Sequence, residues 1–185
     1  MKTDDVTNDA KMNRKLVLIL TLTLLIGTLN VALDVQNAKA SGTIYIRANG
    51  SIDPLTAPIS TVDNVTYLLT GNITTDADGI IVERDNIVVD GAGYTVEGMM
   101  EGASESKGID LSSRINVTVT NIKITSFSYS YGIYLYSSSN NSISGNSITA
   151  NWWGLLLYSS SNNSINGNNI ANNAYGARAH CFHAR

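Results

Sequence analysis

Aromatic side chains are the residues of this sequence best suited to contact a ligand. Tyr134, Tyr136 and Tyr158 stand at outward positions of the similar segments GIYLY and GLLLY. Alternate residues of a strand point to one face, so we expect these tyrosines on one strip, with Tyr136 directly over Tyr158. The strip could stack on sugar rings, or its rings could pack neighbouring strands together. The remaining aromatic residues of this region are expected in the turn before each glycine: Tyr129, Tyr131, Trp152, Trp153 and Tyr175.

The ligand-binding candidates are therefore Tyr134, Tyr136, Tyr158, Trp152 and Trp153. A rigid row of such rings would suit a polysaccharide or another cell-surface polymer. We expect that class of partner.

Acidic side chains are what a carbohydrate-cleaving enzyme would require, as two carboxylates facing one cleft. The acids nearest the repeats are Asp76, Asp78, Glu83, Asp85, Asp90 and Asp110. Asp78 and Asp90 each precede a glycine, which is typical of turns. At the position of Asp110, the next two repeats have Tyr134 and Leu156 in place of a second acid. The pattern favours turn residues, and no catalytic residue is assigned.

Soft metal ligands gather at the C-terminus, where His180, Cys181 and His183 include both histidines and the one cysteine of the chain. Such side chains can bind copper or zinc. The repeat pattern has broken down at this point, so nothing fixes their geometry. We expect no metal site and no cofactor, and these three residues are the candidates if a metal does bind.

Composition excludes several classes of protein. A net charge of -3 with 15% charged residues gives no basic footprint for nucleic acid. A hydrophobic content of 43% is too high for a disordered chain. One cysteine in 185 residues allows no disulfide framework.

The N-terminal segment predicts export. Lys11, Arg14 and Lys15 precede an apolar run over residues 16–33, and Ala38-Lys39-Ala40 follows as a small-x-small cleavage pattern. This order is that of a secretory signal, which assigns residues 1–40 to a signal peptide, with Met12 as the alternative start. The run is long enough that it could also remain as an uncleaved anchor. We expect a secreted, periplasmic or cell-surface protein that meets the membrane only through this segment.

The mature chain is built from repeats. Gly132, Gly154 and Gly176 are evenly spaced, which gives a period of about 22 residues. Between residues 132–151 and 154–173, 14 of 20 positions are identical, and looser copies begin at Gly79 and Gly108. Within each copy the apolar residues alternate with polar ones, which indicates short strands, and glycine, asparagine and serine separate them as turn residues do.

A coil of about 22 residues cannot bury its own apolar face, but it can when successive coils stack in parallel. Ile133 would then lie over Leu155, and Ile143 over Ile165. The predicted fold is all-β: a right-handed, single-stranded parallel β-helix. A β-propeller is the competing repeat fold, but its blades need about 40 residues.

The predicted domain boundaries follow from the same pattern. Residues 41–78 form an atypical N-terminal cap with the first strands, because an open end of such a stack exposes unpaired backbone. Residues 79–176 form the coils. Residues 177–185 form an irregular tail, and we interpret them as the truncated end of a longer helix, with an improvised cap as the alternative.

Asparagines recur at fixed repeat positions. Glycosylation sequons begin at Asn49, Asn64, Asn72, Asn116, Asn140 and Asn162. The last three are equivalent in the repeat, which favours a structural role: Asn116, Asn140 and Asn162 are predicted to hydrogen-bond up the stack as a ladder. A glycan on these residues is the alternative.

The sequence resembles the NosD-like group of right-handed parallel β-helix proteins, which share the pectin-lyase-type fold. The resemblance rests on TIYIRANGSIDP, YLLTGNI, DADGIIVERDNIVVDGAGYTV, GIDL, INVTVTNIKI and two coils of the type SSSNNSISGNSI. It covers residues 43–176 and implies a secreted or surface protein of an archaeon or bacterium. We expect a non-enzymatic module that binds a carbohydrate or surface polymer, or is structural. The resemblance leaves two alternatives: a carbohydrate-active enzyme (lyase, hydrolase or epimerase) and a periplasmic copper-accessory protein.

Overall fold

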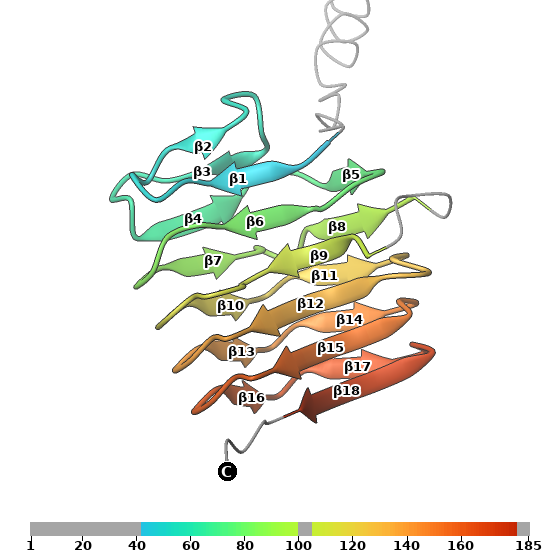
Figure 1. Cartoon of the computed structure of the whole chain (residues 1–185). Coiled ribbons are helices and arrows are strands. Elements are labelled where there is room, and N and C mark those ends of the chain that lie inside the picture. The colour runs from blue at the N-terminus through green and yellow to red at the C-terminus, as the bar shows by residue number, and fades with distance from the viewer. Residues whose placement is uncertain (1–41, 100–104, 181–185) are drawn as a thin grey trace, which may run out of the picture. The chain divides into compact units, whose positions relative to one another are not determined.

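A computed structural model describes residues 42–99 and 105–180 (Figure 1). The predicted signal segment, residues 1–40, and the candidate ligands Cys181 and His183 lie outside the described residues. Strands and turns account for the described part of the chain, in which no helix is long and apolar enough to cross a membrane.

The strands form three sheets. The seven strands of sheet 1 are β1 (Ile44–Ile46), β2 (Ile52–Asp53), β6 (Ile80–Val82), β9 (Lys107–Asp110), β12 (Tyr131–Tyr136), β15 (Trp153–Tyr158) and β18 (Tyr175–His180). Sheet 2 consists of β3 (Ile59–Ser60), β4 (Thr66–Leu69), β7 (Val88–Asp90), β10 (Thr118–Thr120), β13 (Ser142–Ser144) and β16 (Ser164–Asn166). Sheet 3 consists of β5 (Ile73–Thr75), β8 (Thr95–Gly98), β11 (Lys123–Thr125), β14 (Ser147–Thr149) and β17 (Asn169–Ala171).

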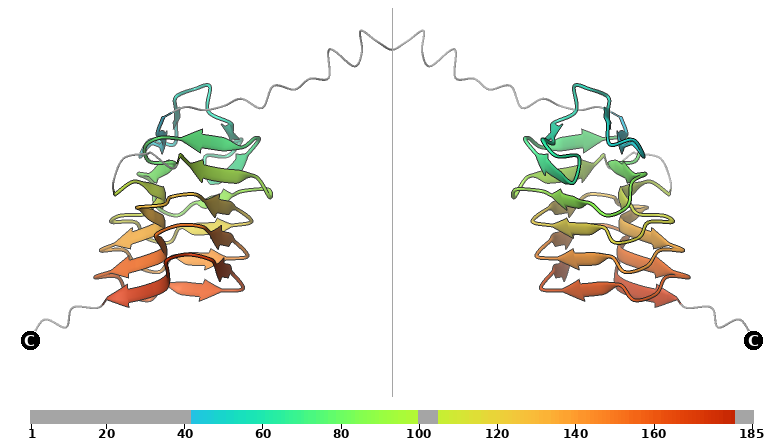
Figure 2. Two further views of the ribbon diagram at one scale, coloured as in Figure 1. Left: turned by 90° about the vertical axis from the view of Figure 1, so that its right-hand side faces the viewer. Right: turned by 90° about the vertical axis from the view of Figure 1, so that its left-hand side faces the viewer.

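Each coil contributes one strand to each sheet, and successive coils pair in parallel (Figures 1 and 2). The predicted registers are confirmed: Ile133 pairs with Leu155, and Ile143 pairs with Ile165. The fold is therefore the predicted parallel β-helix. A period of two within short strands, combined with the even spacing of the repeats, was sufficient to identify it.

The interior is filled by columns of aliphatic side chains, one from each coil. Ile80, Ile109 and Ile133 are fully buried in one such column, and Val89, Val119 and Ile143 in another. Burying a side chain of this size contributes about 1.5–3 kcal/mol. Burial decreases toward the last coil, where Ile165 and Ile170 are only partly covered.

The glycine that opens each repeat is required by close packing between coils. A Cβ added to Gly79, Gly108 or Gly132 would lie 2.4–2.6 Å from the carbonyl oxygen of the glycine in the next coil. The same atom would also touch an aliphatic side chain of the interior. Only glycine fits this column, which explains why it marks the repeat.

The N-terminal segment, predicted as a cap, contains a complete coil as well. Strands β1, β4 and β5 pair in parallel with β6, β7 and β8. Two short strands are added antiparallel: β2 on β1 and β3 on β4. They cover backbone groups that the first coil would otherwise leave unpaired at two sheet edges.

The predicted irregular tail is wrong for residues 177–180. Strand β18 pairs in parallel with β15 from Trp153↔Tyr175 to Tyr158↔His180. Ala177 and Ala179 stand beside Leu155 and Leu157 in this register, so small residues replace the expected large ones. Strand pairing is made by backbone hydrogen bonds, so it continues in β18 although the large apolar side chains of the repeat are absent from this strand.

Candidate functional site: an aromatic groove on sheet 1

The outer face of sheet 1 carries three columns of side chains that run across the coils. The first aromatic column contains Tyr131, Trp153 and Tyr175. The second aromatic column contains Tyr136, Tyr158 and His180. Between them lies the central column, formed by Asp110, Tyr134, Leu156 and Arg178.

The rings of the two aromatic columns stack on one another. In the first column, the Trp153 and Tyr175 centroids are 4.3 Å apart, with the planes inclined by 19°. In the second column, Tyr136 lies 5.7 Å from Tyr158, as predicted, and Tyr158 lies 5.5 Å from His180. These contacts confirm that the aromatic residues pack neighbouring coils together, at about 0.5–1.5 kcal/mol for each pair.

The central column interrupts this stacking and leaves a groove between the aromatic columns. Two depressions lie along it. The N-terminal depression, about 320 Å³, is lined by Glu105, Lys107, Asp110, Ser112, Tyr131, Tyr134 and Tyr136. The C-terminal depression, about 220 Å³, is lined by Tyr131, Trp153, Leu156, Tyr158, Arg178 and His180. Tyr131 borders both, so the two depressions adjoin on successive coils. We call the whole feature the aromatic groove.

Tyr134 stands in the middle of the groove. Its ring centroid is 5.1 Å from that of Tyr131 and 6.5 Å from that of Tyr136, and the planes of Tyr134 and Tyr136 are within 3° of parallel. Lys107 Nζ lies 5.7 Å from the same ring. Burial raises the pKa of the Tyr134 phenol, and the nearby Tyr131 and Asp110 raise it further. The phenol is therefore protonated at neutral pH and can donate a hydrogen bond into the groove.

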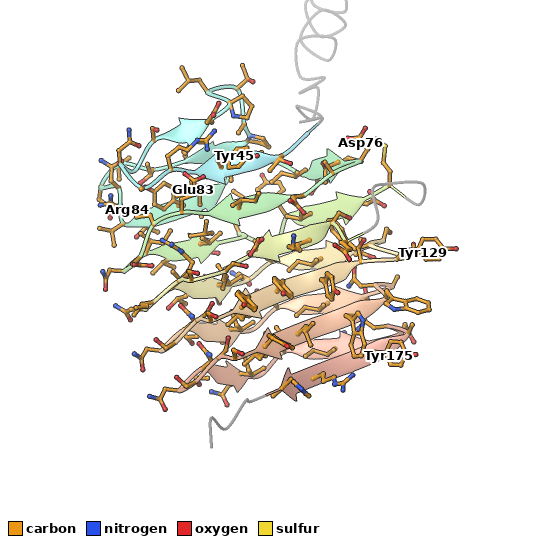
Figure 3. All side chains as sticks on the ribbon, viewed as in Figure 1. Tyr45, Asp76, Glu83, Arg84, Tyr129 and Tyr175 are labelled. Atoms are coloured by element: carbon orange, nitrogen blue, oxygen red, sulfur yellow. The ribbon has the colours of Figure 1, made fainter. Side chains whose placement is uncertain are left out.

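A second group of aromatic residues lies at the corner beside the groove. Tyr129 is 70% exposed, and its ring stacks 6.2 Å from that of Trp152. Trp152 in turn meets Tyr175 edge-on at 5.6 Å. Figure 3 shows Tyr129 and Tyr175 on the same side of the stack.

The two tryptophans that we predicted as ligand-binding residues lie in different places. Trp153 lines the C-terminal depression, whereas Trp152 belongs to the corner group. The expectation that Tyr131, Trp153 and Tyr175 lie in a turn is wrong: they are strand residues that point outward. Their even spacing, equal to that of the repeat glycines, was the signal that could have placed them in one column. The groove is also lined by Lys107, Leu156 and Arg178, which no pattern in the sequence indicates.

Glu105 and Asp110 line the groove, and the carboxylates of Asp110 and of the nearby Asp78 hold backbone groups. Asp110 Oδ1 accepts hydrogen bonds from the Ser112 backbone N–H at 2.8 Å and from Ser112 Oγ at 2.5 Å, and Oδ2 is 3.7 Å from Lys107 Nζ. Asp78 Oδ1 accepts the Lys107 backbone N–H of the next coil at 2.7 Å.

Three of the other acids are engaged as well, by backbone N–H groups or by an arginine. Asp90 Oδ1 accepts the Ala92 N–H at 2.8 Å within its own turn, as predicted. Asp85 accepts the Ile115 N–H at 2.9 Å and lies 3.3 Å from Arg114, while Glu83 pairs with Arg47 at 3.0 Å. Asp76 and Glu83 lie on opposite sides of the stack (Figure 3).

A metal site does not form among the described residues, which bring together no group of three or more histidine, cysteine, aspartate or glutamate side chains. Of the three tail candidates, only His180 is described, and its ring stacks on Tyr158.

The asparagine ladder lies one residue beyond its predicted position. Asn140 and Asn162 are exposed and adopt left-handed φ angles of 57° and 53°. Their successors point inward: Asn141 Nδ2 donates to Asn163 Oδ1 at 3.0 Å. The third predicted member, Asn116, does donate to Asn86 Oδ1 at 2.9 Å, but on the exposed surface.

Two further ladders occupy the other corners of the coil. Asn146 Nδ2 donates to Asn168 Oδ1, and Asn151 Nδ2 donates to Asn173 Oδ1, both at 3.0 Å. Each buried amide also accepts a backbone N–H from the preceding coil. These asparagines fix the corners, so they belong to the architecture rather than to a site.

Comparison with known proteins assigns the fold and nothing finer. Residues 57–183 match the family model described as right handed beta helix region. The chain matches no curated protein and no solved structure.

Proposed function

Because the chain belongs to the right-handed β-helix family, in which fold alone does not determine activity, we propose a function from the groove: a non-enzymatic module that binds a carbohydrate or another surface polymer. The protein is secreted or displayed at the cell surface. The bound chain lies against sheet 1, between the two aromatic columns.

The observation that supports this proposal is the gap in the aromatic stacking. Rings that stack along the helix cover one another in part, although Tyr136 and Tyr175 remain exposed. Where Leu156 and Asp110 replace aromatic residues in the central column, the flanking rings border open depressions instead. Sugar C–H groups can pack against the aromatic carbons that border the depressions, and sugar hydroxyls can bond to phenols, so tyrosine and tryptophan suit them. The strands hold these rings in place before any ligand arrives, which lowers the entropy lost on binding.

The engaged carboxylates disfavour an enzymatic function at this groove. Asp110 already accepts two hydrogen bonds from Ser112 and lies near Lys107, so it serves the turn rather than a reacting sugar. A NosD-like copper function would rest on His180, Cys181 and His183, of which His180 stacks on Tyr158. Glu105 and Asp110 both line the N-terminal depression, and this is the one observation that favours an enzyme; no group of metal ligands among the described residues favours the copper function.

Replacing Tyr134, Tyr136 and Tyr158 together by alanine should weaken polysaccharide binding at least about tenfold, because each lost aromatic contact removes about 0.5–1.5 kcal/mol. Pull-down on insoluble polysaccharides, followed by a titration with the polymer retained, measures the effect. Thr118, Thr120 and Ser142 point outward from sheet 2 and provide a matched triple-alanine control. Equal binding by the tyrosine variant and the control would remove the groove from the proposal.

Export is expected to cleave the chain after Ala40. Mass spectrometry of the protein recovered outside the cytoplasm should give Ser41 as the first residue, because Ala38-Lys39-Ala40 has the small-x-small form that signal peptidases recognise. Recovery of the intact N-terminus from the cytoplasm would contradict secretion. Recovery of the intact chain from membranes would show that residues 16–33 remain as an anchor.

A further inference from the structure

Asparagines form a column at the corner where each coil passes from sheet 1 to sheet 2, on the left of Figure 1. One asparagine lies two residues before the first residue of each parallel strand of sheet 2, and the strand registers place these residues over one another. All of them are exposed, and their φ angles of 53–59° are left-handed. This asparagine column contains Asn64, Asn86, Asn116, Asn140 and Asn162.

The left-handed conformation does not by itself explain these asparagines. Other corners of the coils adopt the same conformation with serine or alanine, as at Ser137, Ser159 and Ala150. Asparagine tolerates left-handed angles well, but these corners show that the fold does not require it. The repetition of asparagine before all five parallel strands of sheet 2 therefore indicates a further use of the side chain.

The hydroxyl that completes a glycosylation sequon recurs in the same coils. A sequon places serine or threonine two residues after the asparagine. Four of the five asparagines meet this condition, and only Asn86 does not, because it is followed at that position by Val88. The hydroxyl residues are Thr66, Thr118, Ser142 and Ser164. The next outward position of the same strands has a hydroxyl only at Thr120 and Ser144, so hydroxyls are enriched where a sequon requires them.

The amides of the column are open to modification. Among residues 42–99 and 105–180, the side chains of Asn140 and Asn162 make no hydrogen bond. Asn116 Nδ2 donates one hydrogen to Asn86 and retains its second. The inward ladder is made by the residues that follow Asn140 and Asn162, so a sugar on the outer asparagine would leave the ladder intact.

The two sequons outside the column are arranged differently. Asn49 Oδ1 accepts hydrogen bonds from the N–H and the hydroxyl of Ser51, which is the hydroxyl residue of its own sequon. Asn72 Oδ1 accepts the Thr95 N–H of the next coil at 3.0 Å. Each of these amides is held against the backbone, whereas the column presents its amides to solvent.

We propose that the asparagine column is a glycosylation site, in which Asn64, Asn116, Asn140 and Asn162 carry N-linked sugars. The Nδ2 atom of each asparagine attacks the anomeric carbon of an oligosaccharide that a transferase presents on a lipid phosphate. A bond forms between Nδ2 and this carbon, the bond from the carbon to the phosphate oxygen breaks, and the lipid phosphate leaves. Nδ2 releases one proton to the transferase. This modification goes beyond the proposed binding function and shares with it only the predicted export.

Mass spectrometry of glycopeptides from the full-length chain, isolated from its own cells, tests the proposal. All four sequon asparagines of the column should carry sugar, with Asn86 unmodified. Ser142→Ala should abolish the sugar on Asn140 and leave the one on Asn162, because it removes a single sequon hydroxyl. Val88→Thr completes a sequon at Asn86 and should add a sugar there.

Ser144→Ala is the matched control, because Ser144 is the other outward serine of β13 and belongs to no sequon. It should leave every sugar in place. Circular dichroism of each variant establishes that the coils remain folded.

Three outcomes would overturn the inference. Unmodified asparagines throughout the column, in chain recovered outside the cytoplasm, would remove the glycosylation and leave the proposed function standing. Sugar confined to Asn49 and Asn72, or sugar that persists on Asn140 in Ser142→Ala, would show that the sequons of the column are not the acceptors. Recovery of the unmodified chain from the cytoplasm alone would overturn the predicted export together with the glycosylation.

Discussion

Replacing Asn146 by alanine is expected to lower the free energy of unfolding by about 3 kcal/mol. This side chain is 2% exposed, and its amide makes three contacts. Oδ1 accepts the Ile122 backbone N–H at 3.1 Å, and Nδ2 donates to the Val119 carbonyl at 2.9 Å and to Asn168 at 3.0 Å. Alanine deprives two buried backbone groups of this partner, and each such loss costs about 1–3 kcal/mol. Denaturant unfolding followed by circular dichroism measures the change.

Asn140→Gly is the control for this substitution. Asn140 is also an asparagine at a coil corner, but it is exposed and has a φ of 57°. Glycine adopts this conformation without strain, so we expect a change below about 1 kcal/mol. Similar losses from both variants would mean that the buried amides do not support the corners as described.

Gly132→Ala is expected to destabilise the protein by about 3 kcal/mol or to prevent folding. Its Cβ would lie 2.5 Å from the Gly154 carbonyl oxygen and 2.8 Å from Ile148 Cγ2. The first of these atoms is backbone of the next coil, so the overlap cannot be relieved by rotating a side chain. The coils would have to separate locally, and their backbone hydrogen bonds would lengthen. Thermal and denaturant unfolding of the purified variant, or its recovery in inclusion bodies, reports the effect.

Gly176→Ala provides the comparison, because Gly176 has the equivalent repeat position in β18. A Cβ at Gly176 would meet no atom within 4 Å. We expect the free energy of unfolding of this variant to lie within about 0.5 kcal/mol of the parent's, as it does for most surface substitutions. If both glycine variants were equally stable, close packing between coils would not be the reason for the glycine column.

The sequence was sufficient to predict the fold because its repeats are nearly identical. The constant spacing of the repeats and their alternating apolar positions determined which side chains stack, as in Ile133 over Leu155. Register in such a stack is strongly determined, since a shift of one residue would turn every buried side chain outward.

The asparagine ladder could not be placed from the repeats alone. Asn140 and Asn141 are adjacent, and both recur in the next repeat, as Asn162 and Asn163. Choosing between them requires the backbone angle at the corner: the first residue turns into the left-handed region, which directs the second inward. Only the three-dimensional structure provides that angle.

The candidate site was predicted in part for a similar reason. The tyrosines are visible as strand residues, but the groove depends on what lies between the aromatic columns. The sequence does not indicate Leu156 and Arg178 as site residues, because neither is aromatic like Tyr134, which has the equivalent strand position in its own coil. The strand at residues 177–180 was not predicted, because backbone hydrogen bonds between strands do not require the alternating apolar side chains on which the prediction relied.

Because each coil adds one residue to every column of the groove, the repeat is the structural unit in which the groove can be lengthened. An in-frame duplication of one coil would lengthen the groove by about 4.8 Å while preserving the contacts within the other coils. A point substitution in the central column would alter one position along the groove and leave its neighbours unchanged. The length of the groove and the side chains along it can therefore be changed independently.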